Sequence, residues 1–296
     1  MTTKKRIALV TIDDAHGCVF GGLIEVLKND YDVTLFMERG WSNYKWFEYY
    51  SDLYGECTFV GNTFKDDVKN YYKIIKLNSG DNILCKEDTV SILHFKPDIS
   101  RNNNSRQFIS LSPFVTGENI NYVFPGFRPV ITHSPKNMVM RLGYCTNGCI
   151  DNETDRFIQN NIDYTFIYVV WGDRNYSNLT KHQNVRVFHD IDTKQLIELI
   201  QHSKFFLSRK VMNYDRYSSL LGMAISFEKP LIVDVKTADA YGLPGFLFNT
   251  DYSDIGKLNL IDDSRYNSVL NATREFKTKV IQNNHATVNK IFTANN

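Results

Sequence analysis

The sequence predicts an α/β protein built from two doubly wound parallel sheets. Short apolar runs of strand length recur along the chain, and segments with helical spacing of apolar residues separate them. The alternation breaks at residues 124–129, where two prolines and a glycine stand close together, and then begins again. A chain of 296 residues exceeds one average domain, so these observations together favour two.

The first half opens as a strand, a helix and a second strand. Residues 6–12 form a continuous apolar run, as expected for a parallel strand covered on both faces. Apolar residues at helical spacing follow Gly21-Gly22, and residues 31–36 supply the next strand. Further strands are expected at 57–60 and 90–95. The aromatic residues between Trp41 and Tyr54 fit either a core or a platform on which a sugar or base stacks.

The second half repeats this alternation more clearly. The expected strands are 130–132, 165–170, 185–188, 205–208 and 230–234. Asp192 followed three residues later by Gln195 resembles a capping box, which predicts a helix start at that point. The chain from residue 262 onward is amphipathic at helical spacing, so its apolar stripe needs a partner surface.

Composition argues against several classes of protein. The 34 basic and 33 acidic residues nearly balance, so nucleic-acid binding through bulk charge is not indicated. We expect no secretory signal and no transmembrane segment, because no apolar run is long enough for either. Five scattered cysteines favour free thiols in a reducing compartment, and a cytoplasmic location is therefore expected.

Ligands of doubly wound sheets lie at the carboxyl ends of strands, which directs attention to the loops that follow them. His16 lies in the loop after the first strand, where it could act in catalysis or cap a turn. His94, near the end of the strand at 90–95, could lie close to a substrate or be a core histidine. Gly21 and Gly22 would let the backbone approach a phosphate or an acceptor, or would allow close packing of a helix on a strand.

The segment Ala224-Ile225-Ser226-Phe227-Glu228-Lys229-Pro230-Leu231-Ile232-Val233 resembles a motif of the GT-B glycosyltransferases that use nucleotide sugars with retention. In that family a helix ending in a Gly-Lys-Pro segment leads into the strand behind the donor site. Here Glu228 stands where glycine is usual. The resemblance covers roughly residues 129–251 and is weak before them.

A second stretch, residues 132–143, resembles the His-Ser/Ala-Pro loop that opens the second domain in one branch of the family. The resemblance implies that His133 orients this loop and that Lys136 and Arg141 hold the donor diphosphate. A leaving nucleoside diphosphate gains negative charge, which fixed cations stabilise. Arg209 and Lys210 follow the strand at 205–208 and could contact phosphate or form a solvated edge.

The family also carries two glutamates eight positions apart, the first contacting the donor sugar and the second the ribose. Counting back from Pro230 places Asp215 at the first position and Met223 at the second. Asp215 keeps a carboxylate, whereas a methionine side chain cannot hold a ribose hydroxyl by a strong hydrogen bond. Either the donor is held differently here, or the chain has lost turnover.

The resemblance implies two Rossmann-like domains facing a central cleft: an acceptor-side domain at 1–127, a nucleotide-sugar domain at 128–262, and a helix at 263–296 returning to the first domain. The expected reaction moves a sugar from a UDP- or GDP-sugar to a glycan or other small acceptor in glycan biosynthesis, with retention. No metal and no cofactor beyond the nucleotide-sugar co-substrate is expected. Asp215, His94 and His16 are the catalytic candidates.

Two other functions remain open on a similar fold. One is polysaccharide pyruvyl transfer or sugar-nucleotide epimerisation, which Arg209 and the lost second glutamate leave possible. The other is a non-catalytic nucleotide-sugar-binding protein, which Met223 favours.

Overall fold

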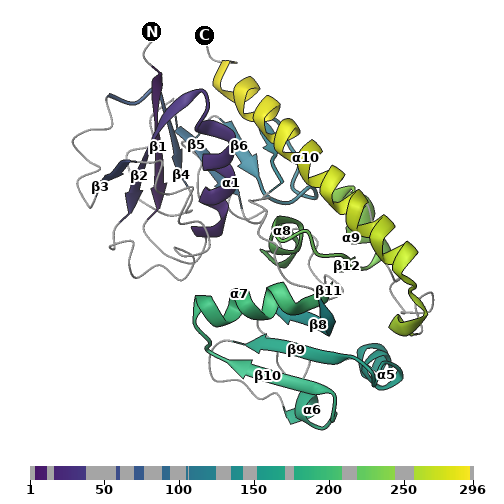
Figure 1. Ribbon diagram of the computed structural model, residues 1–296. Helices are drawn as coiled ribbons and strands as arrows, with labels where there is room; N and C mark the ends of the chain where they lie inside the picture. Colours follow the sequence, from purple (N-terminus) through teal and green to yellow (C-terminus); the bar gives the residue numbers. More distant parts are fainter. Residues whose placement is uncertain are drawn as a thin grey trace. The chain divides into compact units, whose positions relative to one another are not determined.

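The computed structural model describes residues 4–11, 17–37, 58–60, 70–76, 89–93, 105, 107–124, 135–142, 152–170, 177–208, 219–243 and 257–293. Within them, two parallel sheets carry helices on their faces (Figure 1). The α/β fold class predicted by the sequence is therefore confirmed. The chain divides into two compact units between Arg128 and Pro129, and the last helix contributes residues to both.

The sheet of the first unit has seven strands in the order β3-β2-β1-β4-β5-β6-β7. The strands are β1 (Lys5–Thr11), β2 (Tyr31–Met37), β3 (Thr58–Val60), β4 (Lys73–Lys76), β5 (Thr89–Leu93), β6 (Gln107–Ser110) and β7 (Ile120–Tyr122). All neighbouring pairs are parallel. The order reverses between β1 and β4, which is the switch point of a Rossmann sheet.

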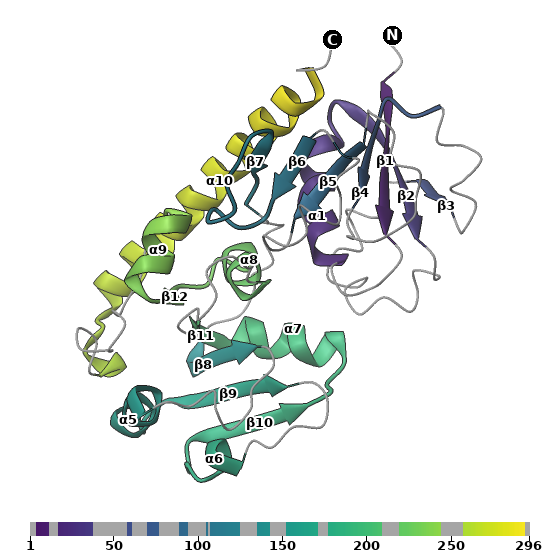
Figure 2. The same cartoon turned by 180° about the vertical axis from the view of Figure 1, so that it is seen from behind.

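Helix α1 (Gly17–Leu27) joins β1 to β2, and it lies on the same face of this sheet as the end of α10 (Asp263–Thr293) (Figure 2). Polar and aromatic contacts join the end of α10 to β2 and the residue before it. Asn289 accepts a hydrogen bond from the Tyr31 hydroxyl at 3.3 Å, and the Phe292 ring meets Tyr31 edge-on at 5.4 Å. His285 lies 2.7 Å from the carboxylate of Asp30. These contacts lie within the first unit, to which the end of α10 from Lys279 onward belongs.

The sheet of the second unit has five parallel strands in the order β10-β9-β8-β11-β12. Its strands are β8 (Lys136–Leu142), β9 (Thr165–Val170), β10 (Val185–His189), β11 (Ser203–Leu207) and β12 (Leu231–Ile232). Its helices are α5 (Asn152–Asn160), α6 (Ser177–Thr180), α7 (Thr193–His202), α8 (Ser219–Ser226), α9 (Val235–Tyr241) and the 3-10 helix η4 (Leu258–Leu260). This is again a Rossmann order, with its switch point between β8 and β11.

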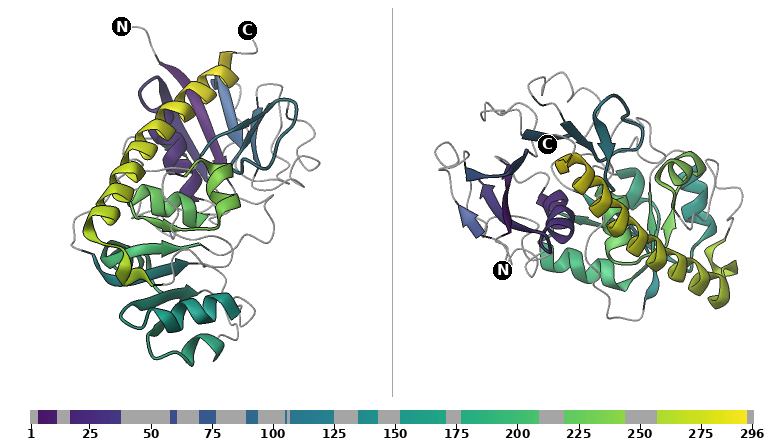
Figure 3. Two further views of the ribbon diagram at one scale, coloured as in Figure 1. Left: turned by 90° about the vertical axis from the view of Figure 1, so that its right-hand side faces the viewer. Right: turned by 90° about the horizontal axis from the view of Figure 1, so that it is seen from above.

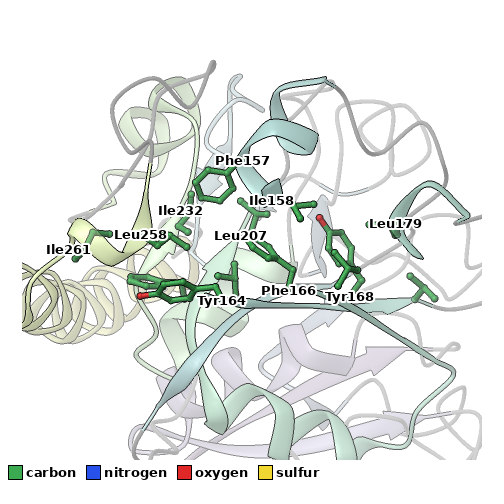
Figure 4. Packing of buried hydrophobic residues seen from close by; sticks show 14 of the residues in the cluster. Phe157, Ile158, Tyr164, Phe166, Tyr168, Leu179, Leu207, Ile232, Leu258 and Ile261 are labelled. Carbon is green, nitrogen blue, oxygen red and sulfur yellow. The ribbon is translucent and has the colours of Figure 1, made fainter. Parts of the chain in front are cut away.

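One apolar cluster forms part of the core of the second unit. Side chains from α5, β9, β11, β12 and η4 pack together, among them Phe157, Phe166, Leu207 and Leu258 (Figure 4). Each of these four is at most 2% exposed. Burial of this kind contributes about 1.5–3 kcal/mol for a large apolar side chain, so the cluster holds the sheet and its helices as one body.

Helix α7 begins as the capping pattern predicts. Asp192 is its N-cap, and its carboxylate accepts a hydrogen bond from the backbone N–H of Gln195 at 2.8 Å. Helix α10 is continuous over its 31 residues (Figure 3), and it begins at Asp263, one residue after the start of the amphipathic segment. Local sequence patterns therefore placed both helix starts.

Glu228 follows α8, and its backbone is left-handed with φ 52°. The N–H of Lys229 donates to the Ala224 carbonyl at 2.8 Å and that of Glu228 to Ile225 at 3.1 Å, the two bonds of a Schellman motif. A side chain in this conformation costs roughly 1–2 kcal/mol. The Glu228 carboxylate offsets part of this cost through an ion pair with Arg274 of α10 at 2.8 Å.

This geometry predicts different stabilities for two substitutions of Glu228. Glu228→Gly removes the left-handed strain and the ion pair together, so its free energy of unfolding should stay within about 1 kcal/mol of the wild type. Glu228→Ala removes only the ion pair and should be less stable than Glu228→Gly by about 1 kcal/mol. Urea denaturation measures both. Equal stability of the two variants would contradict the assigned strain.

Lys229 is buried, and its ammonium group donates to the backbone carbonyl of Gln201 in the last turn of α7 at 2.8 Å. Burial lowers the pKa of Lys229 from 10.5 to about 8. Between these values the unfolded chain binds the proton and the folded chain does not. The free energy of unfolding therefore gains a contribution that grows as the pH rises from about 8 to 10.5 and is absent below this range.

We expect this contribution to reach ~1–3 kcal/mol across the window. Chemical denaturation at pH 7.5 and pH 10 should show it as the difference between the wild type and Lys229→Met, in which the other titrating groups are unchanged. The same pH dependence in both proteins would refute the assignment.

Candidate functional site

The candidate site of the second unit is the carboxyl edge of its sheet beside the switch point. Strands β8 and β11 are neighbours there. The chain continues from β8 to β9 on one side of this pair and from β11 to β12 on the other. Arg141 is the second-to-last residue of β8, and Ser208 directly follows β11. Both side chains are buried, Arg141 at 5% exposure and Ser208 at 2%.

Arg141 is aligned by the neighbouring strand. It stands in register with Tyr168 of β9, and its guanidinium carbon lies 5.7 Å from the centroid of the Tyr168 ring. Attraction between a cation and the face of an aromatic ring is worth ~0.5–2 kcal/mol, most where water is excluded. A guanidinium group also presents a planar set of donors that matches two phosphate oxygens. Arg141 therefore has the chemistry and the position for binding an anion.

The predicted pairing of Lys136 with Arg141 is wrong. The structure has a strand, not a loop, over Lys136–Leu142. Lys136 begins this strand, is exposed, and stands in register with Ser203 at the start of β11. Five residues of extended strand span about 17 Å. Lys136 thus belongs to the amino edge and cannot share one diphosphate with Arg141.

Gly21 and Gly22 do not form a phosphate-binding loop. Both lie inside α1 and are buried. Their backbone groups are those of helix interior residues. Glycine in a helix interior costs about 0.5–1 kcal/mol relative to alanine and is retained where a helix packs closely.

Met223 lies in α8 with 3% of its side chain exposed, among the buried residues of the second unit. The predicted second acidic position therefore supplies a core side chain. It offers no carboxylate to a ribose.

The other predicted residues, His16, His94, His133, Arg209, Lys210 and Asp215, lie outside the described residues, and their roles stay predictions. The strand expected before His133, at 130–132, also lies outside the described residues, whereas strands precede His16, His94 and Arg209. β1 ends at Thr11 before His16, β5 ends at Leu93 directly before His94, and Ser208 precedes Arg209.

The sequence patterns did not predict the buried lysines of β4. Lys73 begins this strand and Lys76 ends it, and they are 4% and 2% exposed. The strand Lys-Ile-Ile-Lys was missed because its two apolar residues are too few to show a period. The signal that could have indicated this strand is the apolar pair Ile74-Ile75 between two lysines, about halfway between the expected strands at 57–60 and 90–95.

Within the described part of the chain, no helix is long and apolar enough to cross a bilayer. The same residues contain no cluster of His, Cys, Asp and Glu suited to a metal ion.

No protein-family model and no curated protein sequence matches this chain. Solved structures do match over nearly its whole length. HepE of Anabaena, determined with UDP and glucose, superposes with a TM-score of 0.62 at 12% identity, covering 97% of this chain and 99% of HepE. Sucrose-phosphate synthase of Thermosynechococcus elongatus gives a TM-score of 0.63 at 12% identity, covering 98% and 99%.

A Listeria monocytogenes protein assigned as a UDP-N-acetylglucosamine 2-epimerase gives a TM-score of 0.53 at 8% identity, covering 100% of this chain and 98% of that one. Together with the two Rossmann sheets, these likenesses show that the fold is that of the GT-B glycosyltransferases.

Proposed function

We propose that this protein is a glycosyltransferase that moves a sugar from a UDP- or GDP-sugar to an acceptor. The observation that carries the proposal is the buried Arg141 at the carboxyl edge of a Rossmann sheet, beside its switch point. A cation fixed there can stabilise the diphosphate as it leaves. The UDP and glucose of HepE, a protein of the same fold, support a nucleotide-sugar donor.

In the proposed reaction, the bond between the anomeric carbon and the β-phosphate oxygen breaks, and the acceptor hydroxyl forms a new bond to that carbon. The electrons of the broken bond go to the diphosphate, and the guanidinium group of Arg141 stabilises its growing negative charge. The acceptor proton leaves with a base or with the departing phosphate. We propose that Asp215 contacts the donor sugar, that His16 and His94 lie near the reacting centre, and that His133, Arg209 and Lys210 contact the nucleotide sugar.

Transfer with retention and without a metal ion, a cytoplasmic location and a role in glycan biosynthesis belong to the same proposal. The resemblance of residues 129–251 supports retention and the role in glycan biosynthesis, and the scattered cysteines support the location. The buried cation of Arg141 supports a reaction without a metal ion. An epimerase is the second candidate, favoured by the fold likeness to the Listeria protein.

A two-part experiment tests the proposal. Thermal unfolding with UDP or GDP at 100 times its dissociation constant should show stabilisation by about 2.7 kcal/mol. A panel of nucleotide sugars, each with and without EDTA, is then assayed for release of nucleoside diphosphate. We expect release from one donor class in both conditions.

The other functions give different results. Conversion of UDP-N-acetylglucosamine to its epimer would favour the epimerase, and nucleotide binding with no turnover of any donor would favour a binding protein. The absence of any response to nucleotides would refute all three.

A further inference from the structure

Arg141 lies on the apolar face of the second sheet, near the carboxyl end of β8. Side chains of a strand alternate between its two faces, so Val139 and Arg141 stand on the same face. Val139 belongs to the apolar cluster of this unit, and so does Tyr168, the register partner of Arg141 on β9. The guanidinium group of Arg141 therefore stands at the end of an apolar face, with an aromatic ring on the neighbouring strand.

The Tyr168 ring is held in place by the residues around it. Tyr168 is fully buried, and it belongs to the same cluster as Ile158 of α5 and Leu179 of α6 (Figure 4). Side chains in a close-packed core keep well-defined rotamers. The centroid of the ring lies 5.7 Å from the guanidinium carbon of Arg141, within the distance at which a ring face attracts a cation. The core thus fixes the ring, and the ring gives Arg141 a fixed surface of partial negative charge.

A fixed orientation matters for a cation that binds a diphosphate. An arginine side chain has several rotatable bonds, and ordering them during binding lowers the affinity. The planar donors of a guanidinium group bind two phosphate oxygens only when the plane is correctly turned. A guanidinium group already held by a ring loses less freedom on binding. Contact with Tyr168 should therefore raise the affinity of Arg141 for a diphosphate.

We propose that Tyr168 is a positioning residue, whose ring holds the Arg141 guanidinium group in the orientation that binds the donor diphosphate. This role rests on the proposed function, in which Arg141 contacts the diphosphate. Tyr168 is 0% exposed, so it acts through Arg141 and does not itself touch the donor. The property that matters is the negative face of the ring rather than the hydroxyl group or the volume of the side chain.

Three variants of the full chain separate these properties. Tyr168→Phe keeps the ring and removes the hydroxyl group, and Tyr168→Leu removes the ring. Pentafluorophenylalanine at position 168 keeps an aromatic ring, but its fluorine atoms withdraw the negative charge from the ring face. Calorimetric titration with UDP and GDP should show Tyr168→Phe within about twofold of the wild type. The leucine and pentafluorophenylalanine proteins should bind about 3- to 30-fold more weakly, the range of a cation–ring interaction.

Two controls separate positioning from a general effect on packing. The same three changes are made in Arg141→Met, where the ring has no cation to hold and nucleotide affinity should change by no more than about twofold. Phe166 stands on the same face of β9, two residues before Tyr168, and is also fully buried in the cluster. Phe166→Leu should lower the stability of the unit but leave nucleotide affinity within about twofold of the wild type.

Equal affinity of the phenylalanine and pentafluorophenylalanine proteins overturns the positioning role, and this comparison decides even where Tyr168→Leu does not fold. Losses that persist in Arg141→Met, or an equal loss in Phe166→Leu, overturn it as well, because they show a general effect of packing. If the wild type binds neither UDP nor GDP, the proposed donor site fails and the positioning role with it. If Arg141→Met weakens binding whereas the pentafluorophenylalanine protein does not, the positioning role alone fails.

Discussion

Replacing Asn284 with leucine is expected to lower the free energy of unfolding by about 2–4 kcal/mol. The Asn284 side chain satisfies both backbone groups of Phe124: its oxygen accepts from the Phe124 N–H at 3.0 Å, and its amide group donates to the Phe124 carbonyl at 2.5 Å. Asn284 and Phe124 are 4% and 3% exposed. Leucine would leave a buried donor and a buried acceptor without these partners, each at about 1–3 kcal/mol.

Two controls separate this effect from a change in the helix. Asn283 is the neighbouring residue of α10 and is exposed, so Asn283→Leu should change stability by no more than about 0.5 kcal/mol. Asn284→Asp keeps the acceptor and loses the donor, and it should also be destabilised. Urea denaturation monitored by circular dichroism provides the measurement. Equal losses for Asn283→Leu and Asn284→Leu would show that the backbone bonds to Phe124 are not the cause.

The second large effect concerns Arg141. Arg141→Met should weaken binding of UDP or GDP by ~1.5–3 kcal/mol, the range for a hydrogen bond to a charged group. Methionine keeps apolar volume beside the Tyr168 ring, so the fold should persist while the cation is lost. Arg141→Lys keeps the charge but loses the planar pair of donors. Its affinity for the nucleotide should lie between those of the wild type and Arg141→Met. Isothermal titration calorimetry measures all three proteins.

Strand β8 supplies its own matched control. Lys136 is a cation of the same strand at the opposite edge of the sheet, so Lys136→Met should leave nucleotide affinity within about twofold of the wild type. Loss of affinity in Lys136→Met, or none in Arg141→Met with the fold intact, would place the diphosphate elsewhere.

The sequence determined the fold class because long apolar runs and helical periods are local signals. Strand 165–170 agrees with β9 at both ends, and strand 31–36 with β2 to within one residue. The Asp192 cap was equally readable, because a cap needs only its own helix. The sequence motif has Glu228 at a position where glycine is usual. The positive φ of Glu228 explains this preference, because glycine adopts such a backbone without strain.

Only the tertiary structure decided which candidate side chains share an edge. Lys136 and Arg141 look like neighbours in the sequence, but an extended strand carries them to opposite edges of one sheet. The bond between Asn284 and Phe124 joins positions 160 residues apart. Contacts of this kind depend on the packing of distant segments, for which a single sequence carries no periodic signal.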